Sequence, residues 1–257
     1  MDHQRPNLVL LGSDNPTTWI VYNRLVQEFG PFPALIEPHM SRVALFQNRI
    51  RKLGLLTPLS QVAFVVLIRP LINYLARKRI NQICRLDGLE GMQPLSPFIT
   101  NIASANGEDC TTFLRRAQAK VIIVNGTRIL KPHILQATPA VFINTHQGIT
   151  PEYRGAHGAY WALLKNDAAN CGVTVHVVDQ GIDTGNIISQ AKITPQADDS
   201  FATYPYLQTA AALPLLSAAI HDALAGTLKT AAIQGPSRVW YHPGFFTYIL
   251  GRLRGVR

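Results

Sequence analysis

Short apolar runs that alternate with helical segments constrain this chain more than any other feature. The runs at 7–12 (NLVLLG), 121–126 (VIIVNG) and 140–146 (AVFINTH) have the composition of buried parallel strands. Helical spacing of apolar residues marks 17–29, 108–118, 157–166 and 201–224, and further strands are expected at 34–37, 98–104, 172–179 and 186–194. The segment 230–235 (TAAIQG) is short and strand-like. This order predicts an α/β fold, an open and mostly parallel sheet with helices on both faces.

Composition fits a single large domain with a short extension. The 257 residues are 47% hydrophobic, which is enough for a packed core, and we expect the domain at 1–195 and a C-terminal helix and extension at 196–257. Three cysteines, an odd number without a C-x-x-C pair, favour neither a disulfide framework nor a zinc knuckle. The short apolar stretch before Gly12 is predicted to be a strand rather than a signal peptide, so we expect a cytoplasmic protein.

One segment carries the whole positive charge excess. Between residues 41 and 85 there is no Asp or Glu, and the remaining 15 basic residues of the chain balance its 15 acidic ones. A surface that served only solubility would carry its charge more evenly. The nine basic residues of the segment are Arg42, Arg49, Arg51, Lys52, Arg69, Arg77, Lys78, Arg79 and Arg85.

The middle of this basic segment, 53–75, is very apolar. Its longest uninterrupted apolar run is 62–68, seven residues, against the roughly 20 needed to span a bilayer, so we expect no transmembrane helix. Two interpretations stay open. The segment is either a helical insertion packed on the domain with solvated basic residues, or an interfacial segment that contacts an anionic ligand or the inner face of the membrane.

Candidate catalytic residues gather in 141–185. Asn144 and His146 are two apart at the carboxyl end of a predicted strand, so their side chains share a face. Asp183 lies in a loop bounded by Gly181 and Gly185, just after another strand. Because α/β sheets place ligands at the carboxyl ends of their strands, an amide, an imidazole and a carboxylate can converge on one crevice.

Taken singly, these residues and the other histidines of the chain are weak evidence for a catalytic site. A single His at a strand end is more often structural, and an Asp between glycines is usually a turn former. His157 fits a hydrogen bond at a helix start better than a contact with an acceptor, and His176 fits a sheet residue better than one that lines the crevice. The eight histidines show no metal-ligand spacing, so no metal site is expected, and the sequence after Gly12 lacks the G-x-G-x-x-G pattern of a dinucleotide site.

Taken together, the motifs of 100–195 resemble the formyltransferase family that uses 10-formyltetrahydrofolate, with weaker agreement at 7–30. Three motifs carry the likeness: Asn-x-His at a strand end, a Pro-x-Tyr-Arg-Gly loop at 151–155, and Asp-x-Gly at 183–185, 37 residues after His146. The segment 121–135 also looks like that family's strand and its loop on the formylfolate side. The resemblance implies a Rossmann-like formyltransferase fold with 1–195 as the catalytic domain.

The resemblance also implies the roles of individual residues. Asn144 would donate to the oxyanion, His146 would stabilise it or move the proton of the amine, and Asp183 would orient the imidazole. For the donor 10-formyltetrahydrofolate we expect contacts from Asn125, Gly126, Arg128, Ile129, Leu130, Val178, Asp179, Gly181 and Ile182. For the acceptor we expect contacts from Tyr153, Arg154 and His157.

The length of the C-terminal part bears on the acceptor. About 60 residues follow 195, too few for the RNA-binding barrel of the initiator-tRNA branch, so we expect no nucleic-acid partner. The chain looks more like the compact forms that formylate amino sugars, on a nucleotide or a lipid carrier, for surface polysaccharide. The aromatic residues at 240–248 either stack on a sugar or base, or pack as a tail. A homodimer, a 10-formyltetrahydrofolate hydrolase, formylation of another small amine such as glycinamide ribonucleotide, and a non-catalytic membrane-surface protein are left open.

Overall fold

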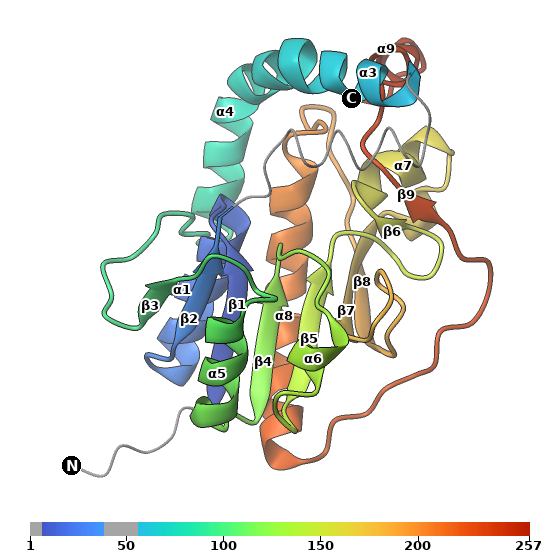
Figure 1. Ribbon diagram of the computed structural model, residues 1–257. Helices are drawn as coiled ribbons and strands as arrows, with labels where there is room; N and C mark the ends of the chain where they lie inside the picture. Colours follow the sequence, from blue (N-terminus) through green and yellow to red (C-terminus); the bar gives the residue numbers. More distant parts are fainter. Residues whose placement is uncertain (1–6, 39–55) are drawn as a thin grey trace.

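A seven-stranded sheet forms the centre of the computed structural model, which describes residues 7–38 and 56–257 (Figure 1). Its strand order is β3-β2-β1-β4-β5-β7-β8; the first five strands are parallel, and β7 and β8 are antiparallel. The predicted open, mostly parallel sheet is thereby confirmed. The strands are β1 (Leu8–Ser13), β2 (Ala34–Glu37), β3 (Ile99–Asn101), β4 (Val121–Asn125), β5 (Val141–His146), β7 (Gly172–Val177) and β8 (Ile187–Lys192).

Alternating side chains along the strands build a core on each face of the sheet. On β1, Leu8 and Leu10 face the core that α1 (Pro16–Phe29) and α8 (Tyr204–Ala225) cover. Val9 and Leu11 face the opposite core, which α5 (Glu108–Ala117) and α6 (Pro132–Leu135) close. Because both faces are covered, the central strands read as continuous apolar runs in the sequence.

A second set of elements covers the carboxyl ends of the strands. It consists of α3 (Leu56–Ala63), the π-helical turn η1 (Phe64–Ile68), α4 (Arg69–Leu86), α7 (Gly158–Leu164) and α9 (Phe245–Leu253), with a 3-10 turn η2 (Ala168–Asn170). Aromatic side chains form their core. Phe64 is fully buried with its ring centroid 5.2 Å from that of Phe201 and 5.1 Å from that of Tyr248.

The basic segment is helical over its described part, 56–85, while 41–55 lies outside the described residues. Helix Pro58–Leu86 is continuous, and by length and composition alone it could cross a membrane, although only 22% of its most apolar window is buried. This differs from the expectation drawn from the seven-residue apolar run. The helix is nevertheless fixed to the domain, because Phe64 is in the aromatic core and Arg79 forms a bidentate ion pair with the buried Asp199.

The C-terminal part returns to the body of the molecule. Helix α8 packs on the sheet through Leu213, Leu216 and Ile220 and shares the core of the domain. The division of the chain into a catalytic domain and a C-terminal extension at 195 stays a prediction. The strand-like 230–235 makes one bridge, between Ala231 and Ile187. Further on, β9 (Val239–Trp240) pairs in parallel with β6 (Arg154–Gly155). The tail therefore lies against the loop that carries the Pro-x-Tyr-Arg-Gly motif.

Candidate active site

A cavity of about 590 Å³ opens at the carboxyl ends of the parallel strands; we call it the catalytic cavity. Loops that follow β1, β4, β5 and β7 line it, as expected for a ligand site in an open α/β sheet. Its polar lining includes Ser13, Asn15, Asn125, Thr127, Asn144, Thr145, His146, Gln147, His157, His176, Asp179, Asp183 and His242.

Asn144 is held by a residue on the neighbouring strand. Antiparallel pairing of β5 with β7 sets His176 directly opposite Asn144, and the Asn144 amide nitrogen lies 3.1 Å from Nε2 of His176. The other ring nitrogen, Nδ1, donates to the carbonyl of Val177 at 2.9 Å, so Nε2 is the atom that accepts from Asn144. The amide nitrogen carries a second hydrogen, and this is the donor that a developing oxyanion needs.

His146 is buried and bound through both ring nitrogens. Nε2 lies 2.7 Å from the carbonyl oxygen of Tyr153, and because a carbonyl only accepts, Nε2 carries a hydrogen. Nδ1 lies 3.3 Å from Oδ2 of Asp183. Gly148 makes this geometry possible, since a Cβ there would lie 2.2 Å from the Tyr153 oxygen and 2.8 Å from Nε2. A proton taken up by His146 therefore goes to Nδ1, beside the carboxylate.

Asp183 is the anionic centre of the cavity. Burial works to raise the pKa of its carboxyl, but the nearby imidazoles of His146 and His176 and the hydrogen bond from the Gly155 N–H outweigh burial and lower the pKa to about 2. Its backbone is left-handed, with φ of 50°, a conformation rare outside glycine and found at constrained functional sites. The carboxylate is thus ionised near neutral pH and faces two imidazoles.

All nine residues predicted to contact the donor line the catalytic cavity. The loop 125–130, which holds the first of these residues, is fixed by a buried carboxylate that the sequence analysis missed. Glu37, at the end of β2, accepts hydrogen bonds from the Ala105 N–H at 2.7 Å, from the Arg128 N–H at 2.7 Å and from Nε of Arg128 at 2.6 Å. The guanidinium of Arg128 is therefore engaged with Glu37, and the backbone of 125–130 is held in one position.

Of the three residues predicted to contact the acceptor, one lines the catalytic cavity and two do not. His157 lines the catalytic cavity, and its Nε2 lies 2.7 Å from Nδ1 of His242. Tyr153 is buried outside the lining, and its hydroxyl donates to Asp167 at 2.8 Å. Arg154 donates from Nη1 to the carbonyl of Ile182 at 3.0 Å, so its described contact is with the loop that carries Asp183 rather than with the cavity.

Two further histidines reach the cavity through tertiary pairing. His176 is a residue of β7, as predicted, and the register of β5 with β7 also brings it to Asn144 and the cavity, the less favoured interpretation. His242 comes from the tail, which carries no motif. Among the described residues no group of three or more His, Cys, Asp or Glu could hold a metal ion. Burial raises the pKa of Cys171 to about 11, and burial with nearby carboxylates raises that of Cys110 to about 12, so neither is a thiolate near neutral pH.

Known proteins resemble this chain in sequence and in structure. The methionyl-tRNA formyltransferase of Pelotomaculum thermopropionicum is 32% identical over 118 residues, which are 46% of this chain and 32% of that protein. The match thus spans about a third of that relative's length. A sugar N-formyltransferase from Shewanella sp. superposes with a TM-score of 0.56 at 14% identity, over 91% of this chain and 76% of that one.

A second solved structure is the N-formyltransferase of Helicobacter canadensis in complex with folinic acid and dTDP-3-aminofucose. It superposes with a TM-score of 0.51 at 15% identity, over 91% of this chain and 70% of that one. At these identities the structural likeness shows a common fold. The profile of the formyl transferase family matches residues 77–211, just over half of the chain. This chain belongs to the formyl transferase family.

Proposed function

We propose that this protein transfers a formyl group from 10-formyltetrahydrofolate to the primary amine of an amino sugar, carried on a nucleotide or a lipid, for surface polysaccharide. The observation that carries the proposal is the convergence of Asn144, His146 and Asp183 at one cavity that all nine expected donor residues also line. An amide donor, a titratable imidazole and a fixed carboxylate are the groups that acyl transfer to an amine requires.

Each of the three side chains has a part that follows from its contacts. The donor, when bound, would supply a formyl carbon that the amine attacks, with negative charge developing on the formyl oxygen; the bond to the folate nitrogen would then break, with one proton lost by the amine and one gained by the departing nitrogen. Asn144, oriented by His176, offers its second amide hydrogen to that oxygen. His146 has its Nε2–H committed to Tyr153, so it handles protons at Nδ1. Asp183 stabilises the imidazolium that results.

Two observations support an amino sugar as the acceptor. The Helicobacter canadensis enzyme was crystallised with an amino sugar on a nucleotide, and this chain has the same fold. The tail after α8 pairs with β6 and contributes His242 to the cavity, so it is positioned to shape an acceptor site. No nucleic-acid partner is proposed. Cytoplasmic localisation and a homodimer stay predictions.

A tetrahydrofolate-release assay with a panel of dTDP- and UDP-linked amino sugars tests the proposal. We expect turnover that needs both the amine and His146, with kcat falling about 10² to 10⁴-fold in His146→Ala. His221→Ala is the matched control, because His221 is exposed on α8 and pairs with Glu28 outside the cavity. Formate release without any amine would identify a hydrolase and overturn the proposal, as would equal turnover by His146→Ala.

A further inference from the structure

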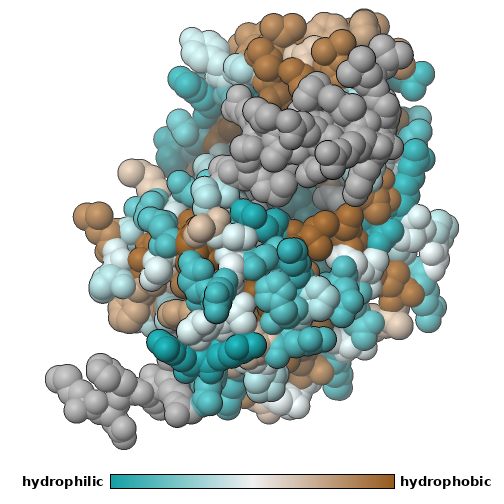
Figure 2. All heavy atoms as spheres, viewed as in Figure 1, coloured by the Kyte–Doolittle hydropathy of each residue, from teal (hydrophilic) through white to brown (hydrophobic). Residues whose placement is uncertain are grey.

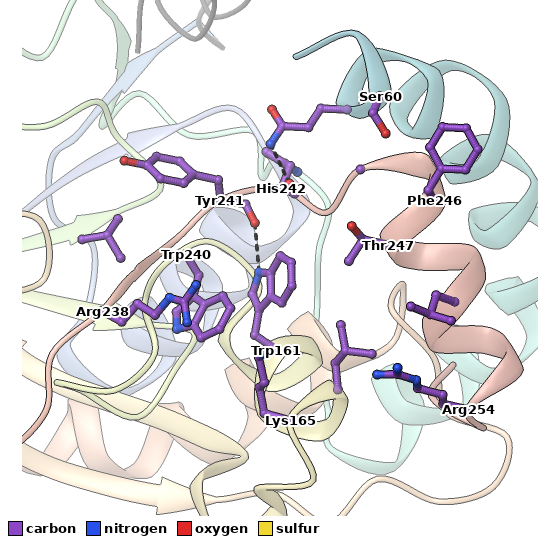
Figure 3. Close-up of a pocket in the computed structure, with 15 residues that line it drawn as sticks. Ser60, Trp161, Lys165, Arg238, Trp240, Tyr241, His242, Phe246, Thr247 and Arg254 are labelled. Atoms are coloured by element: carbon purple, nitrogen blue, oxygen red, sulfur yellow. Dashed lines mark hydrogen bonds between the residues drawn. The ribbon is translucent and has the colours of Figure 1, made fainter. Parts of the chain in front are cut away.

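A second cavity of about 730 Å³ lies beside the catalytic cavity; we call it the outer pocket (Figure 3). Side chains from α3, α7, β9 and α9 line it, and His242 lines both cavities. Its lining contains three cationic side chains, Lys165, Arg238 and Arg254, and no acidic one. A site with this charge, next to a cavity that accepts an amine, suits an anionic group attached to the acceptor.

Two stacked tryptophan rings position one of these cationic side chains, Arg238. The rings of Trp161 and Trp240 stack with centroids 4.7 Å apart, and the Arg238 guanidinium lies 4.1 Å above the Trp240 ring. Trp161 is itself fixed, because its Nε1 donates to the Tyr241 carbonyl at 2.9 Å (Figure 3). A stacked guanidinium keeps its N–H edges for bidentate contact with phosphate oxygens.

The rim of the outer pocket continues into an exposed apolar surface. Phe246 and Leu250 line the pocket, yet they are 76% and 47% exposed, and Ile249 and Leu253 extend their stripe along α9 at helical spacing. The adjoining α3, η1 and α4 expose apolar side chains on their outer face, and together with the α9 stripe these form what we call the apolar platform (Figure 2). The exposed apolar side chains of α3, η1 and α4 in the platform are Leu59, Val62, Val66, Leu67, Leu71, Tyr74 and Leu75.

Charge indicates what covers the apolar platform. Neither 56–86 nor 236–257 contains an Asp or Glu, whereas Arg77, Lys78 and Arg252 are exposed along it. Apolar residues bordered by basic ones are typical of a surface that lies in the interface of an anionic bilayer. Burial of Phe64 and the Arg79–Asp199 ion pair hold the helix on the domain, so the platform lies along a bilayer rather than crossing it.

We propose that the outer pocket binds the phosphate of a lipid carrier that bears the acceptor sugar, and that the apolar platform lies in the bilayer from which this carrier is presented. The proposal rests on the proposed function and narrows it, because a soluble nucleotide carrier would not need an apolar rim. The sugar would then reach the catalytic cavity past His242, which both cavities share.

Binding of farnesyl phosphate, followed by tryptophan fluorescence, to which Trp161 and Trp240 of the pocket contribute, tests the pocket without any formyl donor. We expect saturable binding of farnesyl phosphate, weaker binding of farnesol and of UDP, and a loss of about tenfold or more in Arg254→Gln. Arg252→Gln is the matched control, because Arg252 is exposed on α9 but does not line the pocket. UDP binding more tightly than farnesyl phosphate would overturn the lipid carrier, and equal loss in both variants would overturn the pocket.

Vesicle co-sedimentation tests the apolar platform. We expect binding to vesicles of phosphatidylcholine with 30% phosphatidylglycerol, on the order of tenfold weaker in the double variant Leu67→Gln/Leu71→Gln. Met92→Gln/Leu95→Gln is the control, since it removes two apolar side chains elsewhere that are even more exposed. Equal binding by both double variants, or no binding by the wild type, would refute the platform. A protein that binds farnesyl phosphate and vesicles but transfers no formyl group would refute the proposed function alone.

Discussion

Nδ1 of His146 lies 3.3 Å from Oδ2 of Asp183, although the two residues come from different strand ends and are 37 positions apart. The hydrogen bond from Nε2 to the Tyr153 carbonyl fixes the ring, so the atom that exchanges a proton is the one beside the carboxylate. When His146 takes a proton from the amine in the proposed reaction, the carboxylate beside Nδ1 is placed to accept a hydrogen bond from that atom. In the proposed reaction the pair would therefore remove the proton of the amine.

His176 acts through Asn144, so its replacement tests the amide donor. In His176→Phe the ring nitrogen that accepts from Asn144 is lost, and we expect kcat to fall about 10 to 10²-fold because the oxyanion donor is no longer oriented. The KM for the formyl donor should change little, since the loop 125–130 is untouched. His176→Gln, whose amide oxygen can still accept, should retain more activity than His176→Phe. Equal losses in both variants would argue against this positioning role.

Glu37 holds the loop on the donor side of the catalytic cavity. Glu37→Gln keeps the size of the side chain but removes the charge that pairs with Arg128, and an amide cannot accept all three hydrogen bonds equally well. We expect the KM for the formyl donor to rise about tenfold while kcat at saturating donor stays within a fewfold. Steady-state kinetics at varied donor concentration measure this. Glu90→Gln, which changes an exposed carboxylate, should leave both constants unchanged.

The fold could be predicted because the central strands are buried on both faces. Such strands appear in the sequence as short apolar runs, and those at 7–12, 121–126 and 140–146 correspond to β1, β4 and β5. The segment 230–235 was harder, because an isolated bridge to Ile187 depends on a distant partner rather than on local pattern. The pairing of β9 with β6 is equally non-local.

The part of the candidate site that lies on a single strand could be predicted from the sequence. Asn144 and His146 share a face because they are two residues apart, and that followed from the sequence. The position of His176 did not, since it depends on which residue of β7 stands opposite Asn144. Nor could the sequence tell that the backbone of Tyr153, rather than its ring, contacts His146.

Tyr153→Phe tests whether the side chain contacts the acceptor. Its hydroxyl donates to Asp167 at 2.8 Å and lies outside the cavity lining, so we expect the acceptor KM to stay within twofold. The lost hydrogen bond should lower the free energy of unfolding by about 1 to 2 kcal/mol. Urea unfolding and acceptor kinetics on the same preparation separate the two effects. An acceptor KM that rises tenfold with unchanged stability would restore a binding role for the Tyr153 hydroxyl.

Asp183→Asn should abolish most of the turnover and also change how stability depends on pH. The pKa of Asp183 is lowered from 3.8 to about 2 in the folded protein, so folding favours its ionised form. That contribution, on the order of 2 kcal/mol, is present above about pH 4 and is lost as the pH falls towards 2.

The difference in unfolding free energy between wild type and Asp183→Asn isolates this carboxyl from the others. Urea unfolding at pH 5, 4 and 3 should show the wild type losing stability relative to the variant as the pH falls. Asp109→Asn, which removes an exposed carboxyl on α5 outside the catalytic cavity, is the control for the loss of a carboxyl elsewhere. A difference that does not change between pH 5 and pH 3 would mean that His146, His176 and the Gly155 N–H do not favour the ionised form. Asp183 could then not stabilise the imidazolium that the proposed reaction requires.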